Sequence, residues 1–356
     1  DLPLVASAMD GVVSPETAVL VHKLGGLGVL NLEGIWTRFE NAEEKLEEIS
    51  RVSKDKATAL MQEIYETPVK KELIAQRVAE IKAEGAVVCG SFTPQSVQEN
   101  YEAALEAGLD ILVIQGTVIS AEHVSTTVEP LNLKEFIAEV PVPTVVGGCA
   151  SYSTGLHLMR TGAVGVLVGV GPGAACTTRG VLGIGVPQAT AIADVAAARS
   201  QHMLETGEYV NVIGDGGMRT GGDISKAIAC GADAVMIGSP LARAKEAPGR
   251  GYHWGMATFH SSLPRGTRVT TVQDGTMEEI LLGPAHENDG TFNLMGALRT
   301  SMATTGYEDI RSFQRAEMMI APALMTEGKK LQTEQAVGMG SNGRAAVSAG
   351  VVVADD

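Results

Sequence analysis

The stretch VGVLVGVGPGAACTTR, residues 164–179, joins a short apolar run to a glycine-rich turn and ends with a cysteine beside hydroxyl side chains. The apolar run is rich in β-branched residues, which predicts a strand over 164–169. Glycine has no Cβ, so the turn can bend sharply and bring its backbone close to a ligand. Backbone dipoles or a nearby positive charge can favour the thiolate of a cysteine held in such a turn. We therefore predict that Cys176 is a nucleophile.

Similar runs recur along the chain, and each is followed by a helical pattern. This alternation is typical of βαβ units around a parallel sheet. The predicted strands cover residues 2–9, 27–32, 86–91, 110–115, 143–148, 164–169, 210–214 and 234–238. That is the strand count of a (β/α)8 TIM barrel, so we predict one catalytic domain over residues 1–335. Its active site is expected at the carboxyl ends of the strands, where Cys176 falls.

Three segments depart from this alternation. Residues 33–80 are charged and helical, which predicts a helical insertion with a solvated face at 43–48. Residues 250–284 are rich in Gly, Thr and Pro, which predicts a short flap over the barrel mouth. Residues 336–356 predict a flexible tail. The first residue is Asp and a strand begins at once, so we expect the natural chain to start earlier.

Composition limits the possible partners. The chain has 42 acidic and 27 basic residues and a formal charge of −15, a field that repels nucleic acid and anionic membrane surfaces. No apolar run approaches the roughly 20 residues of a membrane span. The cysteines, Cys89, Cys149, Cys176 and Cys230, lack metal-binding spacing, which indicates reduced thiols in a cytoplasmic protein.

Gly169, Gly171 and Ala174 also fit the dinucleotide-binding pattern G-x-G-x-x-G/A, and Asp194 lies about 20 residues further on. Such a turn opens directly into a helix, whereas Gly183 and Pro187 interrupt the next stretch here. The barrel interpretation is therefore preferred over a Rossmann fold.

Two further turns predict a nucleotide site. Asp215-Gly216-Gly217 ends the seventh predicted strand, and Gly238-Ser239 ends the eighth. In TIM barrels a phosphate site often forms at these two positions. Glycine backbone N–H groups and the Ser239 hydroxyl can bind phosphate, while Asp215 can accept hydrogen bonds from ribose hydroxyls.

With these residues identified, the chain resembles the IMP dehydrogenase/GMP reductase family across almost its whole length. The similar motifs are GVGPGAACTTRG at 169–180, GVPQATAIAD at 185–194, DGGMRTGGDISKAIACGADAVMIGS at 215–239 and ASAMD at 6–10. The chain resembles a short branch of that family, because no regulatory CBS-type insert separates the second and third predicted strands. The resemblance implies a TIM barrel that is usually tetrameric.

The resemblance also implies roles for single residues. Cys176 would attack C2 of the purine, with Thr178 as its polar helper. The nucleotide contacts would be Ser7, Met9, Asp215 at the ribose, Gly217, Gly238 and Ser239 at the phosphate, and His253, Gly255 and Met256. The carbonyls of Gly171, Gly173 and Cys176 would form part of a potassium site. His260 is left unassigned.

Other positions depart from the family pattern, mainly on the cofactor side. Gln115-Gly116-Thr117 stands where the family usually has Asp, Cys149 where it has Asn, and Leu167 where it has Lys or Arg. The cofactor side of the site is therefore remodelled, and we predict that Gln115, Gly116, Thr117 and Cys149 bind NAD there.

The phosphate loop and the flap also differ from the family. Ala174 replaces the Ser of the phosphate loop. The flap is too short for the family's Arg-Tyr pair, and Arg265 replaces a Glu. Arg265 and Thr178 are the candidates for activating water.

The sequence thus predicts oxidation of IMP to XMP with NAD, through a covalent Cys176 thioimidate, in guanine nucleotide biosynthesis. Two alternatives stay open. One is GMP reductase, which runs the same cysteine chemistry with NADPH. The other is a non-catalytic purine-nucleotide-binding regulator, which the changed cofactor positions would suit. The predicted partners are IMP, NAD, potassium and further copies of this chain, with no nucleic acid and no membrane.

Overall fold

Parallel strands close on one another to form a barrel in the order β1-β2-β3-β4-β5-β6-β7-β8. They are β1 (Leu4–Ala6), β2 (Leu27–Asn31), β3 (Cys89–Phe92), β4 (Ile111–Gln115), β5 (Thr144–Cys149), β6 (Gly165–Val168), β7 (Asn211–Asp215) and β8 (Ala234–Ile237). Every predicted strand overlaps one of these. The barrel closes where Val5 of β1 pairs with Met236 of β8. The prediction of a TIM barrel is confirmed.

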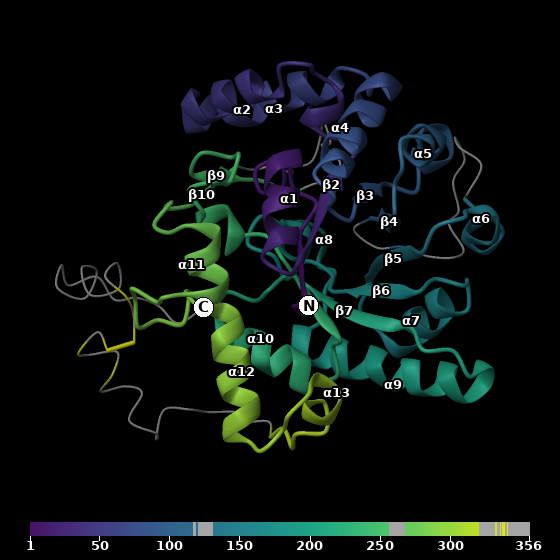
Figure 1. The fold of residues 1–356 in the computed structure, drawn as a ribbon, viewed down its shortest axis with the longest axis vertical. Coiled ribbons are helices and arrows are strands. Elements are labelled where there is room, and N and C mark those ends of the chain that lie inside the picture. Colours follow the sequence, from purple (N-terminus) through teal and green to yellow (C-terminus); the bar gives the residue numbers. More distant parts are fainter. Residues whose placement is uncertain are drawn as a thin grey trace.

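This computed structural model describes residues 1–116, 119, 131–255 and 268–319, together with 332, 335, 337, 338 and 340. The helices of these residues cover the barrel in chain order (Figure 1). They are α1 (Pro15–Lys23), η1 (Ile35–Thr37), α2 (Ala42–Arg51), α3 (Lys54–Glu66), α4 (Lys71–Ala83), α5 (Val97–Glu106), α6 (Leu133–Glu139), α7 (Tyr152–Met159), α8 (Thr178–Leu182), α9 (Gln188–Thr206), α10 (Gly221–Ala229), η2 (Leu241–Arg243), α11 (Met277–Leu282), α12 (Leu294–Thr304) and α13 (Ile310–Phe313).

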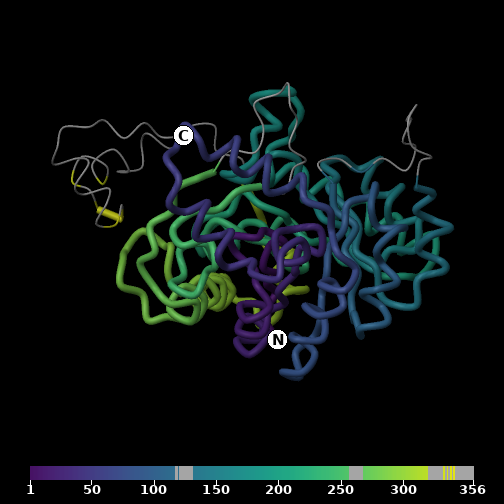
Figure 2. Tube along the Cα trace, turned by 90° about the horizontal axis from the view of Figure 1, so that it is seen from above, coloured from purple at the N-terminus to yellow at the C-terminus, as the bar shows by residue number. Residues whose placement is uncertain are grey.

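Seen from above, the middle of the chain and its last helices lie on opposite sides of the molecule, with the N-terminal segment between them (Figure 2). This placement fits a barrel that closes by pairing its first strand with its last. Among the described residues, no helix combines the length and apolar character needed to cross a membrane.

The barrel interior is filled by a cluster of apolar side chains from the strands. Period-2 alternation sends every second residue of a strand inward. The buried members are Val5, Ala8, Val29, Cys89, Val113, Val145, Leu167 and Met236, with Leu27, Ile111 and Ile213 packed against them. Burial raises the pKa of the Cys89 thiol. Leu167 is therefore part of the barrel core.

The first strand is shorter than predicted. The chain leaves β1 after Ala6, because the N–H of Ser7 bonds the carbonyl of Ile237 and the N–H of Met9 bonds the carbonyl of Ser7 at 2.7 Å. Ser14 then caps α1 by accepting the N–H of Thr17 at 3.1 Å. The turn between these elements places Ser7 and Met9 at the mouth of the barrel.

The predicted helical insertion over 33–80 needs a correction at its end. α4 belongs to the ring of barrel helices, since it buries Leu73, Ile74 and Val78 and packs beside α1 and α5. The inserted part is η1, α2 and α3. In α2 the predicted solvated face is real, because Glu43, Glu44 and Glu48 are exposed while Leu46 and Ile49 are buried.

The flap predicted over 250–284 contains a short antiparallel hairpin, and its last part is the helix α11. β9 (Tyr252–His253) pairs with β10 (Val269–Thr270), His253 opposite Val269. Figure 1 shows this hairpin next to α2. The Arg268 guanidinium stacks on the Tyr252 ring at 4.0 Å and donates to the carbonyls of Ile49 and Val52, at the end of α2. The flap stem is thus fixed to the insertion. Most of the predicted tail lies outside the described residues.

Candidate active site

The cysteine loop follows β6 at the carboxyl rim of the barrel. The Cys176 thiol is partly exposed and donates to the Thr178 hydroxyl, with 3.1 Å between sulfur and oxygen. Thr178 itself is only 1% exposed. The Cys176 N–H bonds the Gly173 carbonyl at 2.9 Å, which fixes the turn that presents the sulfur. The predicted nucleophile and its predicted helper therefore touch each other.

Close approach explains the glycine that starts this loop. Gly169 has a φ of 152°, and a Cβ there would lie 2.2 Å from the Asp215 carbonyl oxygen. Only glycine fits so near a neighbouring backbone. The cysteine loop is therefore packed against the end of β7, where the predicted ribose-binding residue lies.

The ends of β7 and β8 form the other wall of the site. Asp215, Gly217, Gly238 and Ser239 all line one cavity with Cys176. A Cβ on Gly238 would lie 2.5 Å from the Met9 sulfur, so β8 and the segment after β1 meet closely there. The residues predicted to hold ribose and phosphate are brought together with the cysteine.

Asp215 has an unexpected neighbour. Its carboxylate accepts a hydrogen bond from the Gln115 amide at 3.2 Å, across the barrel mouth from β4. Burial raises the pKa of Asp215 to about 7, and the Gln115 bond only partly offsets this. Gln115 was predicted on the cofactor side. The structure places it against the predicted ribose carboxylate instead.

Cys149 does not reach the cavity. It is 0% exposed, and its thiol points to the Leu167 carbonyl at 3.5 Å. Strict alternation would put Cys149 on the inner face with Val145, but the pairing register shifts between Gly147 and Cys149. Such an irregularity turns a side chain to the other face. Burial raises the pKa of this thiol to about 12. We therefore leave Cys149 out of the site.

The remaining predicted residues divide into three groups. Ser7, Met9, Gly116, Gly171, Gly173 and Gly255 line the cavity. His253 lies behind the wall, with Nε2 2.8 Å from the Ser239 hydroxyl and Nδ1 2.7 Å from the Thr271 hydroxyl. Thr117, Met256, His260 and Arg265 lie outside the described residues.

A buried network that the sequence analysis missed closes the cavity from the insertion. Tyr65 of α3 lines the cavity and donates its hydroxyl to Asp10, which is 0% exposed. Trp254 donates its indole N–H to the Tyr65 oxygen at 2.8 Å. Burial raises the pKa of both Asp10 and Tyr65. The network joins the insertion, the segment after β1 and the flap stem.

No local pattern marks this network in the sequence. Tyr65 lies 55 residues from Asp10, and the bond between them exists only after folding. The sequence contains one weak signal for it. Tyr65 directly follows the buried Ile64 in α3, a helix that the sequence analysis assigned to the solvated insertion.

The cavity measures about 1330 Å³. This volume exceeds the about 300–1,000 Å³ of a pocket for one drug-sized ligand. Asn31, Ser91, Thr93, Gln95 and Ser96 extend the cavity from the cysteine loop over the ends of β2 and β3. Among its described lining residues the cations are Arg38 and Arg219.

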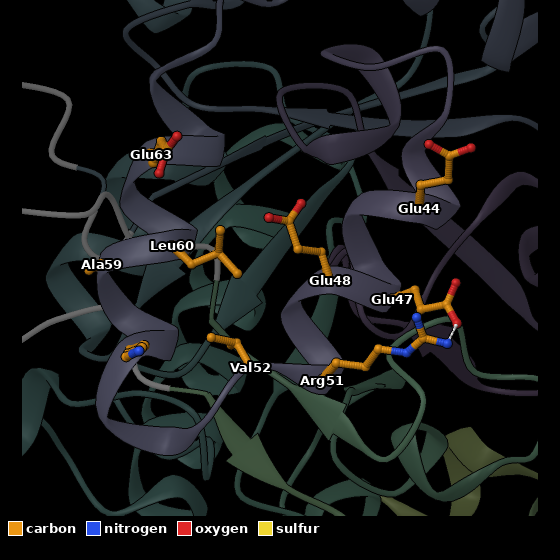
Figure 3. Close-up of a pocket in the computed structure, with 9 residues that line it drawn as sticks. Glu44, Glu47, Glu48, Arg51, Val52, Ala59, Leu60 and Glu63 are labelled. Atoms are coloured by element: carbon orange, nitrogen blue, oxygen red, sulfur yellow. Dashed lines mark ion pairs between the residues drawn. The ribbon is translucent and has the colours of Figure 1, made fainter.

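A second hollow of about 780 Å³ lies on the insertion, between α2 and α3 (Figure 3). Its polar lining is mainly acidic, with Glu44, Glu47, Glu48 and Glu63 around Leu60, and Arg51 pairs with Glu47. It has none of the predicted site residues and plays no part in the site described above.

The match to a domain family covers nearly the whole chain. A sequence profile described as IMP dehydrogenase / GMP reductase domain matches residues 1–330. The chain belongs to this family. It is an oxidoreductase of the IMP dehydrogenase/GMP reductase family, and the resemblance noted in its motifs is confirmed.

Similar members of the family support the fold and its extent. An uncharacterized oxidoreductase of Mycolicibacterium smegmatis is 46% identical over 329 residues, covering 90% of this chain and 88% of that protein. The inosine-5′-monophosphate dehydrogenase of Cryptosporidium parvum is 32% identical, covering 70% of this chain and 61% of that protein. The crystal structure of an IMP dehydrogenase/GMP reductase-like protein from Corynebacterium glutamicum superposes with a TM-score of 0.84 and 44% identity, covering 90% of this chain and 85% of that one.

Proposed function

We propose that this protein oxidises IMP to XMP with NAD, through a covalent bond between Cys176 and C2 of the purine. The observation that carries the proposal is the 3.1 Å contact between the Cys176 thiol and the Thr178 hydroxyl, in a cavity shared with Asp215 and Ser239. A pure binding protein has no need of a thiol at this point. The two walls suit a ribonucleotide whose base reaches the sulfur.

The Cys176 thiolate would form a bond to C2 of the purine. NAD, when bound in the same cavity, would supply the acceptor for the hydride that C2 gives up. Water would then form a bond to C2 and give up one proton to solvent, and the bond from C2 to sulfur would break, which releases XMP and restores the thiolate. Asp215 and Ser239 hold the ribose and the phosphate throughout, so that C2 stays within reach of the sulfur.

The cysteine loop also suits a monovalent cation. Gly171, Gly173 and Cys176 offer neutral carbonyl oxygens, the donor type of a weakly held potassium ion. Among the described residues no group of three or more His, Cys, Asp or Glu side chains could hold a metal ion. We propose that these carbonyls contribute to a potassium site that shapes the turn below Cys176.

One assay tests the proposal. Purified protein with IMP, NAD and potassium is expected to produce reduced nicotinamide and XMP. The same protein is assayed with GMP and NADPH, since reductive deamination uses the same cysteine. Consumption of NADPH with GMP and no reaction with IMP would replace the proposed activity with that of a GMP reductase. Binding without turnover in either assay would indicate a regulator.

A further inference from the structure

A buried histidine lies directly behind the predicted phosphate contact. His253 of β9 is 2% exposed and sits between two hydroxyl groups, those of Ser239 and Thr271. Burial lowers the pKa of His253 to about 4, so the imidazole is neutral at physiological pH. A neutral imidazole has one nitrogen that donates and one that accepts. The position of its proton therefore decides which way both hydroxyls point.

The two tautomers leave Ser239 with opposite properties. With the proton on Nδ1, Nε2 accepts the Ser239 hydroxyl hydrogen, and the oxygen presents only lone pairs to the cavity. With the proton on Nε2, the ring donates to the Ser239 oxygen, and the hydroxyl hydrogen is free to point into the cavity. A phosphate at neutral pH has chiefly acceptor oxygens, so only the second arrangement suits it.

We propose that His253 is a positioning residue that turns the Ser239 hydroxyl toward the phosphate of the nucleotide. Hydrogen bonds then run in one direction: the Thr271 hydroxyl donates to Nδ1, Nε2–H donates to the Ser239 oxygen, and the Ser239 hydroxyl donates to a phosphate oxygen. The inference rests on the proposed function for the identity of the phosphate. It assigns His253 an indirect role in place of the direct nucleotide contact expected from the sequence.

The arrangement also links the flap stem to the phosphate. His253 lies on β9, and Thr271 directly follows β10. The N–H of Thr271 bonds the carbonyl of Gly251 at 2.7 Å, which closes the hairpin around the histidine. β9 and the residue that follows β10 are therefore linked to one serine hydroxyl through His253.

Binding measurements with IMP and inosine test the role, because inosine lacks the phosphate. His253→Leu is expected to weaken IMP binding by about tenfold and to leave inosine binding unchanged. His253→Gln keeps a donor and an acceptor and is expected to restore most of the affinity. Thr271→Val removes the hydroxyl that donates to Nδ1 in the proposed arrangement and is expected to give a smaller loss, again for IMP alone.

A double-mutant cycle separates positioning from a structural effect. In a Ser239→Ala background, His253→Leu is expected to cause no further loss of IMP affinity. Equal losses with and without Ser239, or equal losses for IMP and inosine, would overturn the proposal.

A second measurement does not depend on the enzyme's reaction. Nitrogen-15 NMR of the imidazole, with inorganic phosphate as the probe, reports which ring nitrogen carries the proton. We expect the proton on Nε2 in phosphate-saturated protein. A proton on Nδ1, or no binding of phosphate at Ser239, overturns the inference. If IMP fails to bind while phosphate binds with the proton on Nε2, the proposed function fails and the positioning role stands.

Discussion

The two sides of the barrel mouth are built differently. At the ends of β6, β7 and β8, backbone turns and short polar side chains gather around Cys176, and each predicted residue of that side in the described chain lines the cavity or lies directly behind it. At the ends of β4 and β5, Gln115 is drawn to Asp215 and Cys149 is buried in the wall. The residues predicted to hold the nucleotide thus gather around Cys176, whereas Gln115 and Cys149, predicted to bind the cofactor, make contacts elsewhere in the fold.

Removing the cysteine has the largest expected effect on this comparison. Cys176→Ala is expected to lower kcat by about a thousandfold or more, because no other described thiol lines the cavity. Binding of IMP, measured by calorimetry, is expected to persist. Cys230→Ala, at the end of α10, is the matched control and is expected to keep full activity. Comparable turnover by Cys176→Ala would remove the covalent mechanism.

Acid pH tests the nucleotide side through Asp215. Because its pKa in the free protein is about 7, the carboxyl must release a proton before it can accept ribose hydroxyls as a carboxylate. Inosine affinity is therefore expected to fall by up to about tenfold per pH unit below pH 7 and to level off above it. Asp215→Asn is expected to flatten this profile. An unchanged profile in that variant would assign the titration elsewhere.

The same shift affects stability. The pKa of Asp215 is raised from 3.8, so the folded protein binds a proton that the unfolded chain has already lost between pH 3.8 and about 7. The contribution of this group to stability is complete below pH 3.8 and is lost as pH rises toward 7. Denaturant midpoints of the wild type and Asp215→Asn over this range are expected to converge at low pH.

The buried network of Tyr65, Asp10 and Trp254 gives a further test with a smaller expected effect. Tyr65→Phe leaves the buried Asp10 with one partner fewer and takes away the acceptor of the Trp254 indole, so the free energy of unfolding is expected to fall by about 1–3 kcal/mol. Thermal unfolding measures the loss. Tyr101→Phe is the control, because that ring stacks on Phe136 and its hydroxyl has no hydrogen-bond partner among the described residues. Equal shifts in both variants would mean that the network adds nothing.

Gln115 provides the finest test. Gln115→Leu removes the bond to Asp215, and nucleotide affinity is expected to fall by about fivefold while the KM for NAD stays the same. The pH below which inosine binding weakens is expected to rise, since the carboxylate loses a stabilising donor. A change confined to the KM for NAD would return Gln115 to the cofactor side and contradict the comparison drawn above.

The sequence predicts this fold well because a parallel barrel buries its strands on both faces, so each strand stands out as an apolar run such as 164–169. Cys176, Asp215 and Ser239 were predictable for the same reason, since they follow such runs directly. Cys149 was misplaced because a register shift inside β5 reverses its face, and no residue type announces such a shift. Tyr65 and the pairing of Gln115 with Asp215 depend on contacts between residues 55 and 100 positions apart.

The hydrogen bonds from Arg268 to the end of α2 limit how the flap can be redesigned. Arg250 adds to them through an ion pair with Glu47 at 3.5 Å, so both ends of the flap are tied to the inserted helices. A longer flap taken from a relative would replace the arginines that bind the native flap to α2. We therefore expect a chimera that exchanges the flap together with the inserted helices to fold where a chimera that exchanges the flap alone does not.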